Sequence, residues 1–184
     1  MEASISITRS REELKEILTS TEPPASLIPE LAEAAQNPDL VRDRPGLSVF
    51  KSAAEPYLAD IENIPRLTYT RFRDVQRYTN RYIYRVPQFE KRAKMAAAAV
   101  QVMLGDEDYV NTLYDYMWST CEETKWILPQ REDLEIDLRV CGTGFTMAEL
   151  IVGLAHKLEE RIVRRVREEI DRRVFTRYLD RKEG

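Results

Sequence analysis

Apolar residues recur at helical spacing along almost the whole chain, and this pattern constrains the fold more than any other feature of the sequence. They stand three or four positions apart, which collects them on one face of a helix. No stretch alternates apolar and polar residues as a half-buried strand does. The pattern predicts an all-α protein. Helices of about 15–22 residues with short connections are typical of antiparallel helical hairpins.

Local stop and start signals divide the chain into two regions. Ser10 and Glu13 form a capping box that opens a short helix, and a second short helix is expected from Ser26 to about Gln36. Residues 37–46 (NPDLVRDRPG) have the composition of a linker. We therefore expect an N-terminal arm of two short helices and a linker over residues 1–46, followed by a helical-hairpin region over residues 47–184.

Longer helices are expected after the linker. Pro65 and Pro87 stand where a proline suits the first turn of a helix, Asp106 is a candidate N-cap and Gly105 a candidate C-cap. The expected helices span residues 47–61, 66–84, 88–104, 107–124, 136–155 and 159–180. His156 falls at the turn between the last two helices.

Composition excludes several classes of function. The chain has 184 residues, a formal charge of −4, two cysteines and one histidine, so neither a disulfide framework nor a zinc site is expected. No glycine-rich phosphate loop or nucleophile elbow is present, and no cofactor is predicted. Signal-peptide and membrane-spanning patterns are absent, which predicts a cytoplasmic protein without a membrane partner. Both cysteines, Cys121 and Cys141, are interpreted as small buried apolar residues.

The segment from Arg66 to Lys94 is strongly basic and rich in tyrosine. It holds nine basic residues and two acidic ones, a net charge of +7, so the rest of the chain nets −11. Four of its arginines recur every fourth residue and would line one flank of a helix: Arg73, Arg77, Arg81 and Arg85. One interpretation is a groove for an acidic polymer, with Arg77, Arg81 and Tyr82 as contacts. The other is a solvated flank that pairs with acidic helices. The offsetting charge elsewhere argues against nucleic acid as the partner.

A second candidate region is the segment WSTCEETKWILPQREDLEIDLR, residues 118–139. Two tryptophans and an acidic pair stand in an irregular connection between long helices, the kind of loop that forms a ligand rim. Trp126, Glu122 and Gln130 are its candidate contacts. The alternative is structural: Trp126, Ile127 and Leu128 close one end of the helical core.

Three pieces of sequence follow one another in a fixed order. They are CEETKWILP (Cys121–Pro129), IDL…TGFTMAELIVGL (Ile136–Leu154) and RVREEIDRRVFTRYL (Arg165–Leu179). Their order and spacing, over about residues 66–180, resemble the N-terminal helical region of heparinase II/III-like polysaccharide lyases.

The resemblance implies an incomplete (α/α) toroid whose cleft takes an acidic, uronate-containing polysaccharide. Such lyases neutralise the uronate carboxylate, remove the C5 proton with a base and protonate the leaving oxygen. It also implies substrate binding, in whole or in part, by the six residues already singled out: Trp126, Glu122, Gln130, Arg77, Arg81 and Tyr82. The resemblance implies no metal or cofactor.

Two departures from the family bear on activity. The family's Leu-Pro loop often continues with a histidine, whereas Gln130 and Arg131 follow here. Its chains also run on into segments that carry further catalytic groups, whereas this sequence ends at Gly184. We therefore expect an N-terminal toroid part that is inactive alone and that forms homo-oligomers through uncovered helix faces. The alternative is a non-enzymatic all-α protein-interaction module that self-associates.

Overall fold

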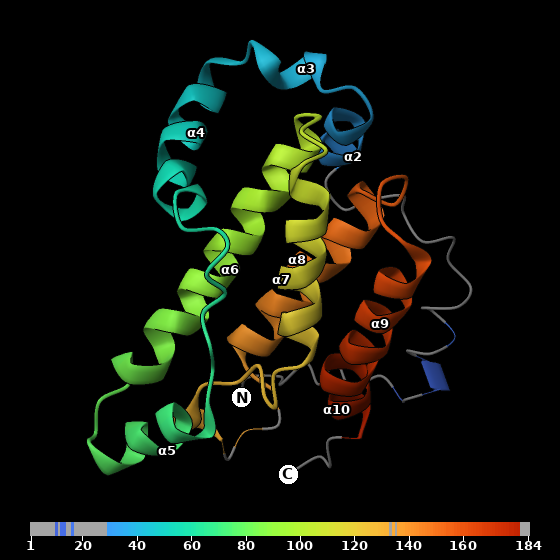
Figure 1. Cartoon of the computed structure of the whole chain (residues 1–184). Helices are drawn as coiled ribbons and strands as arrows, with labels where there is room; N and C mark the ends of the chain where they lie inside the picture. The colour runs from blue at the N-terminus through green and yellow to red at the C-terminus, as the bar shows by residue number, and fades with distance from the viewer. Residues whose placement is uncertain are drawn as a thin grey trace, which may run out of the picture.

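The structure is a computed structural model that describes residues 10, 12–13, 16, 29–132, 134 and 136–180. Every regular element in these residues is helical, which confirms the all-α prediction (Figure 1). The elements are α2 (Pro29–Gln36), α3 (Asp39–Arg42), α4 (Pro45–Leu58), α5 (Tyr69–Arg77), α6 (Tyr82–Met103), α7 (Tyr109–Cys121), η1 (Pro129–Arg131), α8 (Leu138–Gly153), α9 (Glu160–Ile170), η2 (Asp171–Phe175) and α10 (Thr176–Leu179). Of these, η1 is a 3₁₀ turn and η2 is a π-helical turn.

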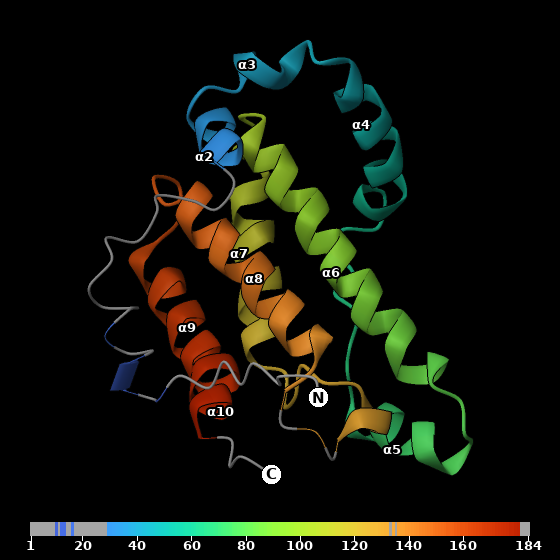
Figure 2. The same cartoon turned by 180° about the vertical axis from the view of Figure 1, so that it is seen from behind.

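Helices α6 to α9 form two antiparallel hairpins that pack side by side (Figures 1 and 2). Helix α6 ends at the predicted glycine cap, where Gly105 has a φ of 90°. The backbone N–H of Asp106 reaches Gln101 O at 3.0 Å, as in a Schellman cap. On α8, Asp137 caps the helix by accepting from the backbone N–H groups of Arg139 and Val140 at 2.8 and 2.9 Å.

The main core lies between these four helices. Small side chains on α6, including Ala98 and Ala99, let α7 approach closely, while Met117 and Met147 fill the centre. Helix α2 packs against α6 and α8 and adds Ala35 to the same core. The boundary at residue 46 stays a prediction.

The end of the bundle that carries α5 has its own small core. Val75, Tyr84 and Leu128 are buried together there, and the rings of Phe72 and Tyr84 meet edge to face at 5.5 Å. This cluster ties α5 to the start of α6 and to the connection between α7 and α8. That connection builds the candidate site.

The prediction of a single helix over residues 66–84 is wrong. Helix α5 ends at Arg77, and Thr79 adopts a left-handed φ of 51°. The N–H of Asn80 then bonds to Val75 O at 3.1 Å, and Asn80 Oδ1 accepts from the N–H of Tyr82 at 3.1 Å. Asn80 therefore closes one helix and starts the next, because a short amide side chain competes with the helical backbone bonds.

The prediction that Pro87 opens a helix is also wrong, because α6 begins at Tyr82 and runs through it. A proline within a helix leaves the carbonyl four residues earlier without its N–H partner. Here that carbonyl belongs to Ile83, and it accepts a long hydrogen bond (3.5 Å) from Arg71 of α5. The Arg71 side chain thus replaces part of the backbone hydrogen bonding that Pro87 removes.

Several further sequence expectations have clear outcomes. The capping box exists: Ser10 N donates to Glu13 Oε2 at 2.7 Å, and Glu13 N donates to Ser10 Oγ at 3.2 Å. The start expected at Ser26 lies outside the described residues. Cys121 is buried as predicted, whereas Cys141 is exposed because it lies on the outer face of α8. In the part of the chain that the structure describes, none of the helices has the length and apolarity to traverse a bilayer.

Candidate functional site

A basic cleft opens at the end of the bundle that carries α5, η1 and α10. It encloses about 220 Å³ between the α7–α8 connection and the turn that leads from α9 to α10. Four of its lining side chains are cationic: Lys125, Arg172, Arg173 and Arg177. Among the residues that the structure describes, its wall has a single carboxylate, Glu132, which pairs with Lys125 at 2.5 Å. The cleft therefore favours anionic groups.

Arg173 fastens the two sides of the cleft together. Its Nε donates to Glu169 Oε2 at 2.5 Å. Its two terminal nitrogens donate to backbone carbonyls of the facing connection, those of Cys121 (3.1 Å), Thr124 (3.2 Å) and Glu123. A guanidinium suits this position because its donors point in several fixed directions at once. Burial lowers the pKa of Arg173, and the neighbouring Glu169 opposes that shift.

Glu123 holds the same connection from its other side. It is buried, and its carboxylate accepts hydrogen bonds from both terminal nitrogens of Arg92, at 2.7 and 2.6 Å. It also forms an ion pair with Lys91 at 3.1 Å. Lys91 also donates to Ser119 O at 2.9 Å. A bidentate guanidinium–carboxylate pair of this kind is strongly oriented. The Arg173–Glu169 pair and the Glu123–Arg92–Lys91 group thus hold the backbone of residues 119–126 in place.

Tyr84 lies beside this charged group and is buried. Burial and the negative charge of Glu123 raise the pKa of Tyr84 to about 12. Its hydroxyl therefore stays protonated at neutral pH and is unsuited to act there as a base.

Trp126 lines the cleft, but only 1% of the residue is exposed. Its indole N–H donates to Thr120 O at 2.9 Å, and the guanidinium carbon of Arg173 lies 4.8 Å from the ring centroid. Ile127 and Leu128 are buried beside it. This matches the structural interpretation of the segment: the ring closes the core and supports Arg173 by a cation–π contact.

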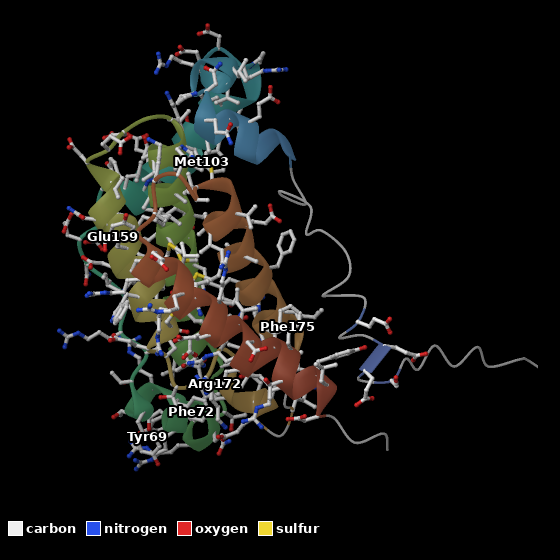
Figure 3. The ribbon with its side chains drawn as sticks, turned by 90° about the vertical axis from the view of Figure 1, so that its right-hand side faces the viewer. Tyr69, Phe72, Met103, Glu159, Arg172 and Phe175 are labelled. Carbon is white, nitrogen blue, oxygen red and sulfur yellow. The ribbon has the colours of Figure 1, made fainter. Side chains whose placement is uncertain are left out.

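Arg172 is a cation of the cleft that extends into solvent. Its side chain is 56% exposed and donates to Glu169 Oε2 at 2.6 Å. Figure 3 shows it at the same end of the molecule as Tyr69 and Phe72 of α5, and opposite the end with Met103. Arg172 and Arg173 both belong to η2, and single π-helical turns of this type are frequent at functional sites.

The three basic-segment candidates lie at the tip formed by the α5–α6 turn, where each is exposed. The predicted four-arginine flank is wrong, because the break at Thr79 separates Arg73 and Arg77 on α5 from Arg81 and Arg85 at the start of α6. Arg77 stacks over Tyr78 at 5.4 Å, and Arg81 stacks over Tyr82 at 5.3 Å.

The remaining two candidates flank the cleft without lining it. Glu122 is exposed and accepts from the indole N–H of Trp118 at 2.8 Å. Gln130 is exposed on η1, which packs against α5. None of the six candidates besides Trp126 contributes to the cleft wall. Their roles as substrate contacts stay predictions.

Sequence reasoning missed the C-terminal cations of the cleft. Arg172, Arg173 and Arg177 lie in a helix interpreted only as amphipathic. A signal was present: Ile162, Val166, Glu169 and Arg173 follow at spacings of four, three and four. That spacing places an oppositely charged pair on the apolar stripe, where charges occur almost always paired.

Two other sets of groups bear on the chemistry. His156 lies at the α8–α9 turn, at the opposite end of the bundle from the cleft (Figure 1). Among the described residues, no three histidine, cysteine or acidic side chains gather closely enough to hold a metal ion.

Comparisons with known proteins add no relative to this description. No family model, curated protein or solved structure matches the chain.

Proposed function

We propose that this chain is the N-terminal part of the (α/α) toroid of a heparinase II/III-like polysaccharide lyase, and that its basic cleft binds an anionic group of an acidic, uronate-containing glycan. One observation carries the proposal: the cleft is built where two of the three segments that resemble this family meet. Arg173, from Arg165–Leu179, bonds to carbonyls of Cys121–Pro129 and stacks on Trp126.

The chemistry of the cleft supports an anionic ligand. Guanidinium groups match the two oxygens of a carboxylate or the oxygens of a sulfate. Arg172 presents such a group to solvent, and Lys125 stands across the cleft from it. A volume of about 220 Å³ is below the roughly 300–1,000 Å³ of a pocket for a drug-sized ligand. It suits a single sugar ring or its charged substituent.

We propose further that this chain by itself binds glycan without cleaving it. β-Elimination needs a base at the C5 proton and an acid at the leaving oxygen. Arg131 and Gln130 follow the Leu-Pro pair where the family often has histidine, and His156 lies at the far end of the bundle. Tyr84, next to the cleft network, is buried with its pKa raised to about 12.

The test is a calorimetric titration of the chain with polygalacturonate, heparin and alginate, with neutral dextran as the control polymer. We expect salt-sensitive binding to at least one polyanion and none to dextran. Arg172→Ala/Arg177→Ala should weaken that binding at least about tenfold, since hydrogen bonds to charged groups contribute about 1.5–3 kcal/mol each.

Arg161→Ala/Arg164→Ala is the matched control, because it removes two exposed arginines from the opposite half of α9. It should change affinity less than about threefold, as expected for screened surface charges. Arg77→Ala/Arg81→Ala tests the α5–α6 tip in parallel. If only the tip variant weakens binding, the cleft is not the site. If none does, neither basic surface takes the glycan.

A specific observation favours the alternative, a self-associating interaction module: α8 has an exposed apolar face. Such a module would bind no polyanion with salt sensitivity, so the same titration separates the two functions.

A further inference from the structure

The outer face of α8 is apolar and uncharged. Leu138, Phe145 and Val152 are 90%, 48% and 37% exposed, and they follow one another at intervals of seven. The two charged residues of α8 present no free charge on this stripe: Glu149, one turn after Phe145, is buried, and the exposed Arg139 stacks on Phe89 at 3.8 Å. Figure 2 shows α8 facing the viewer, with α2 packed near its upper end in that view.

The apolar surface continues onto the C-terminal turn. The π-helical turn η2 packs against α8 and carries Phe175, 43% exposed (Figure 3), and Tyr178 of α10 is 55% exposed. At roughly 200 Å² for a large exposed apolar side chain, these five residues expose about 550 Å². That is at the upper end of the roughly 300–600 Å² found for the largest patch of a typical monomer.

We propose that this α8 face is a dimerisation surface whose partner is a second copy of this chain, paired α8 against α8 in antiparallel orientation. The spacing is self-complementary: Phe145 is midway between Leu138 and Val152, so a two-fold axis at Phe145 sets Leu138 against Val152 of the partner subunit. Intervals of seven are those of a helix–helix seam. Such a two-fold contact uses the same patch on both copies.

Area and charge both favour a second copy. Two such faces together remove about 1,100 Å² from water, just above the roughly 1,000 Å² that a specific interface requires. A stripe without charge offers nothing to attract a basic or acidic partner, whereas it matches an identical stripe. Small residues beside the stripe, Gly142 and Ala148, allow two helices to approach closely.

Sedimentation velocity over about 1–100 μM tests the proposal. We expect the mass to rise with concentration from 21.5 kDa toward about 43 kDa. Phe145→Glu buries a charge on the two-fold axis and should hold the protein at 21.5 kDa throughout. Val49→Glu, which alters an exposed valine of α4, should dimerise like the wild type. Far-ultraviolet circular dichroism of both variants verifies that they are folded.

Disulfide trapping tests the antiparallel orientation of the two α8 helices. In a Cys141→Ser background, Phe145→Cys should form a disulfide-linked dimer under mild oxidation, because the two thiols meet on the axis. Val49→Cys in the same background should not. A wild-type chain that stays monomeric at 100 μM overturns the proposal, including the case in which another part of the same chain covers α8. So does a dimer that Phe145→Glu leaves intact. Neither outcome bears on glycan binding by the cleft.

Discussion

At the scale of single residues, the cleft depends on Arg173 and Glu169. Each is buried, and each would be costly to leave unpaired in the interior. Arg173 turns this pair into a connection between α9 and the α7–α8 segment by adding three backbone carbonyls to its partners. The same pair positions Arg172, which shares Glu169 Oε2. The charged network is therefore structural first, and it also holds Arg172 at the cleft where we propose that an anion binds.

We predict that Glu169→Gln destabilises the protein by about 3–5 kcal/mol at pH 7, because it leaves Arg173 as a buried charge without its counterion. Burial works to raise the pKa of Glu169, but the hydrogen bonds and charges of Arg172 and Arg173 outweigh it and lower the pKa below 4.5. The wild type thus gains this stability above about pH 4.5 and loses it as pH falls through the lowered pKa.

The gap in unfolding free energy between wild type and Glu169→Gln should therefore narrow from pH 7 to pH 3. Urea unfolding at several pH values measures it. Glu168→Gln changes an exposed glutamate on the same helix and serves as the control, with an expected effect within about 0.5 kcal/mol. An equally large difference in unfolding free energy at pH 3 and pH 7 would contradict the role of Glu169 as the counterion of Arg173.

Sequence reasoning at this scale succeeded for residues that follow a local rule. The Ser10–Glu13 capping box and the Gly105 cap require only near neighbours in the chain. It failed for Cys141, because helical spacing shows which residues share a face but not which face the rest of the fold covers. The backbone carbonyls that accept from Arg173 could not be predicted either, because they lie about 50 residues away in the sequence.

At the scale of elements, α8 and η2 pack with little room to spare. A Cβ added to Gly144 would lie 2.9 Å from Cγ2 of Val174, whereas one added to Gly142 would meet nothing within 4 Å. The two glycines sit on opposite sides of one helix, which makes them a matched pair. Gly144 is required by close packing, and Gly142 is not.

We predict that Gly144→Ala destabilises the protein by about 1–3 kcal/mol through overpacking, despite the better helix propensity of alanine. Gly142→Ala should stabilise it by about 0.5–1 kcal/mol, because alanine restricts the unfolded chain and favours the helix. Thermal unfolding at a protein concentration low enough to keep the chain monomeric compares the two. Equal effects of the two substitutions would show that α8 and η2 do not pack as described.

Element boundaries show where the sequence was informative. Periodicity predicted the existence of every long helix, and it placed α8 and the α8–α9 turn within a few residues. Periodicity predicted one helix through α5 and the start of α6, because arginines and tyrosines continue through residues 78–81. The turn at Asn80 was not predicted, because it depends on the hydrogen bond of the Asn80 side chain. The sequence pattern started α6 at Pro87 instead of Tyr82, because the contact from Arg71 that supports the helix before Pro87 is tertiary.

At the scale of the whole molecule, one end of the bundle carries the basic cleft and one side exposes an apolar helix. The α5–α6 tip, the cleft and the turn η2 all lie at the end opposite the α6–α7 and α8–α9 turns (Figure 1). Charge separation of this kind was visible in the sequence as a +7 segment within a −4 chain. Its position beside the C-terminal cations became apparent only in three dimensions, because those cations come from distant parts of the chain.

Hydrogen–deuterium exchange with and without a saturating polyuronate oligosaccharide tests whether the cleft binds an anionic glycan group, as we propose. We expect slower exchange in peptides covering residues 121–132 and 171–178, with no change in α4 or at the α8–α9 turn. Slower exchange confined to the α5–α6 tip, or unchanged exchange in both cleft segments while the oligosaccharide is demonstrably bound, would contradict it.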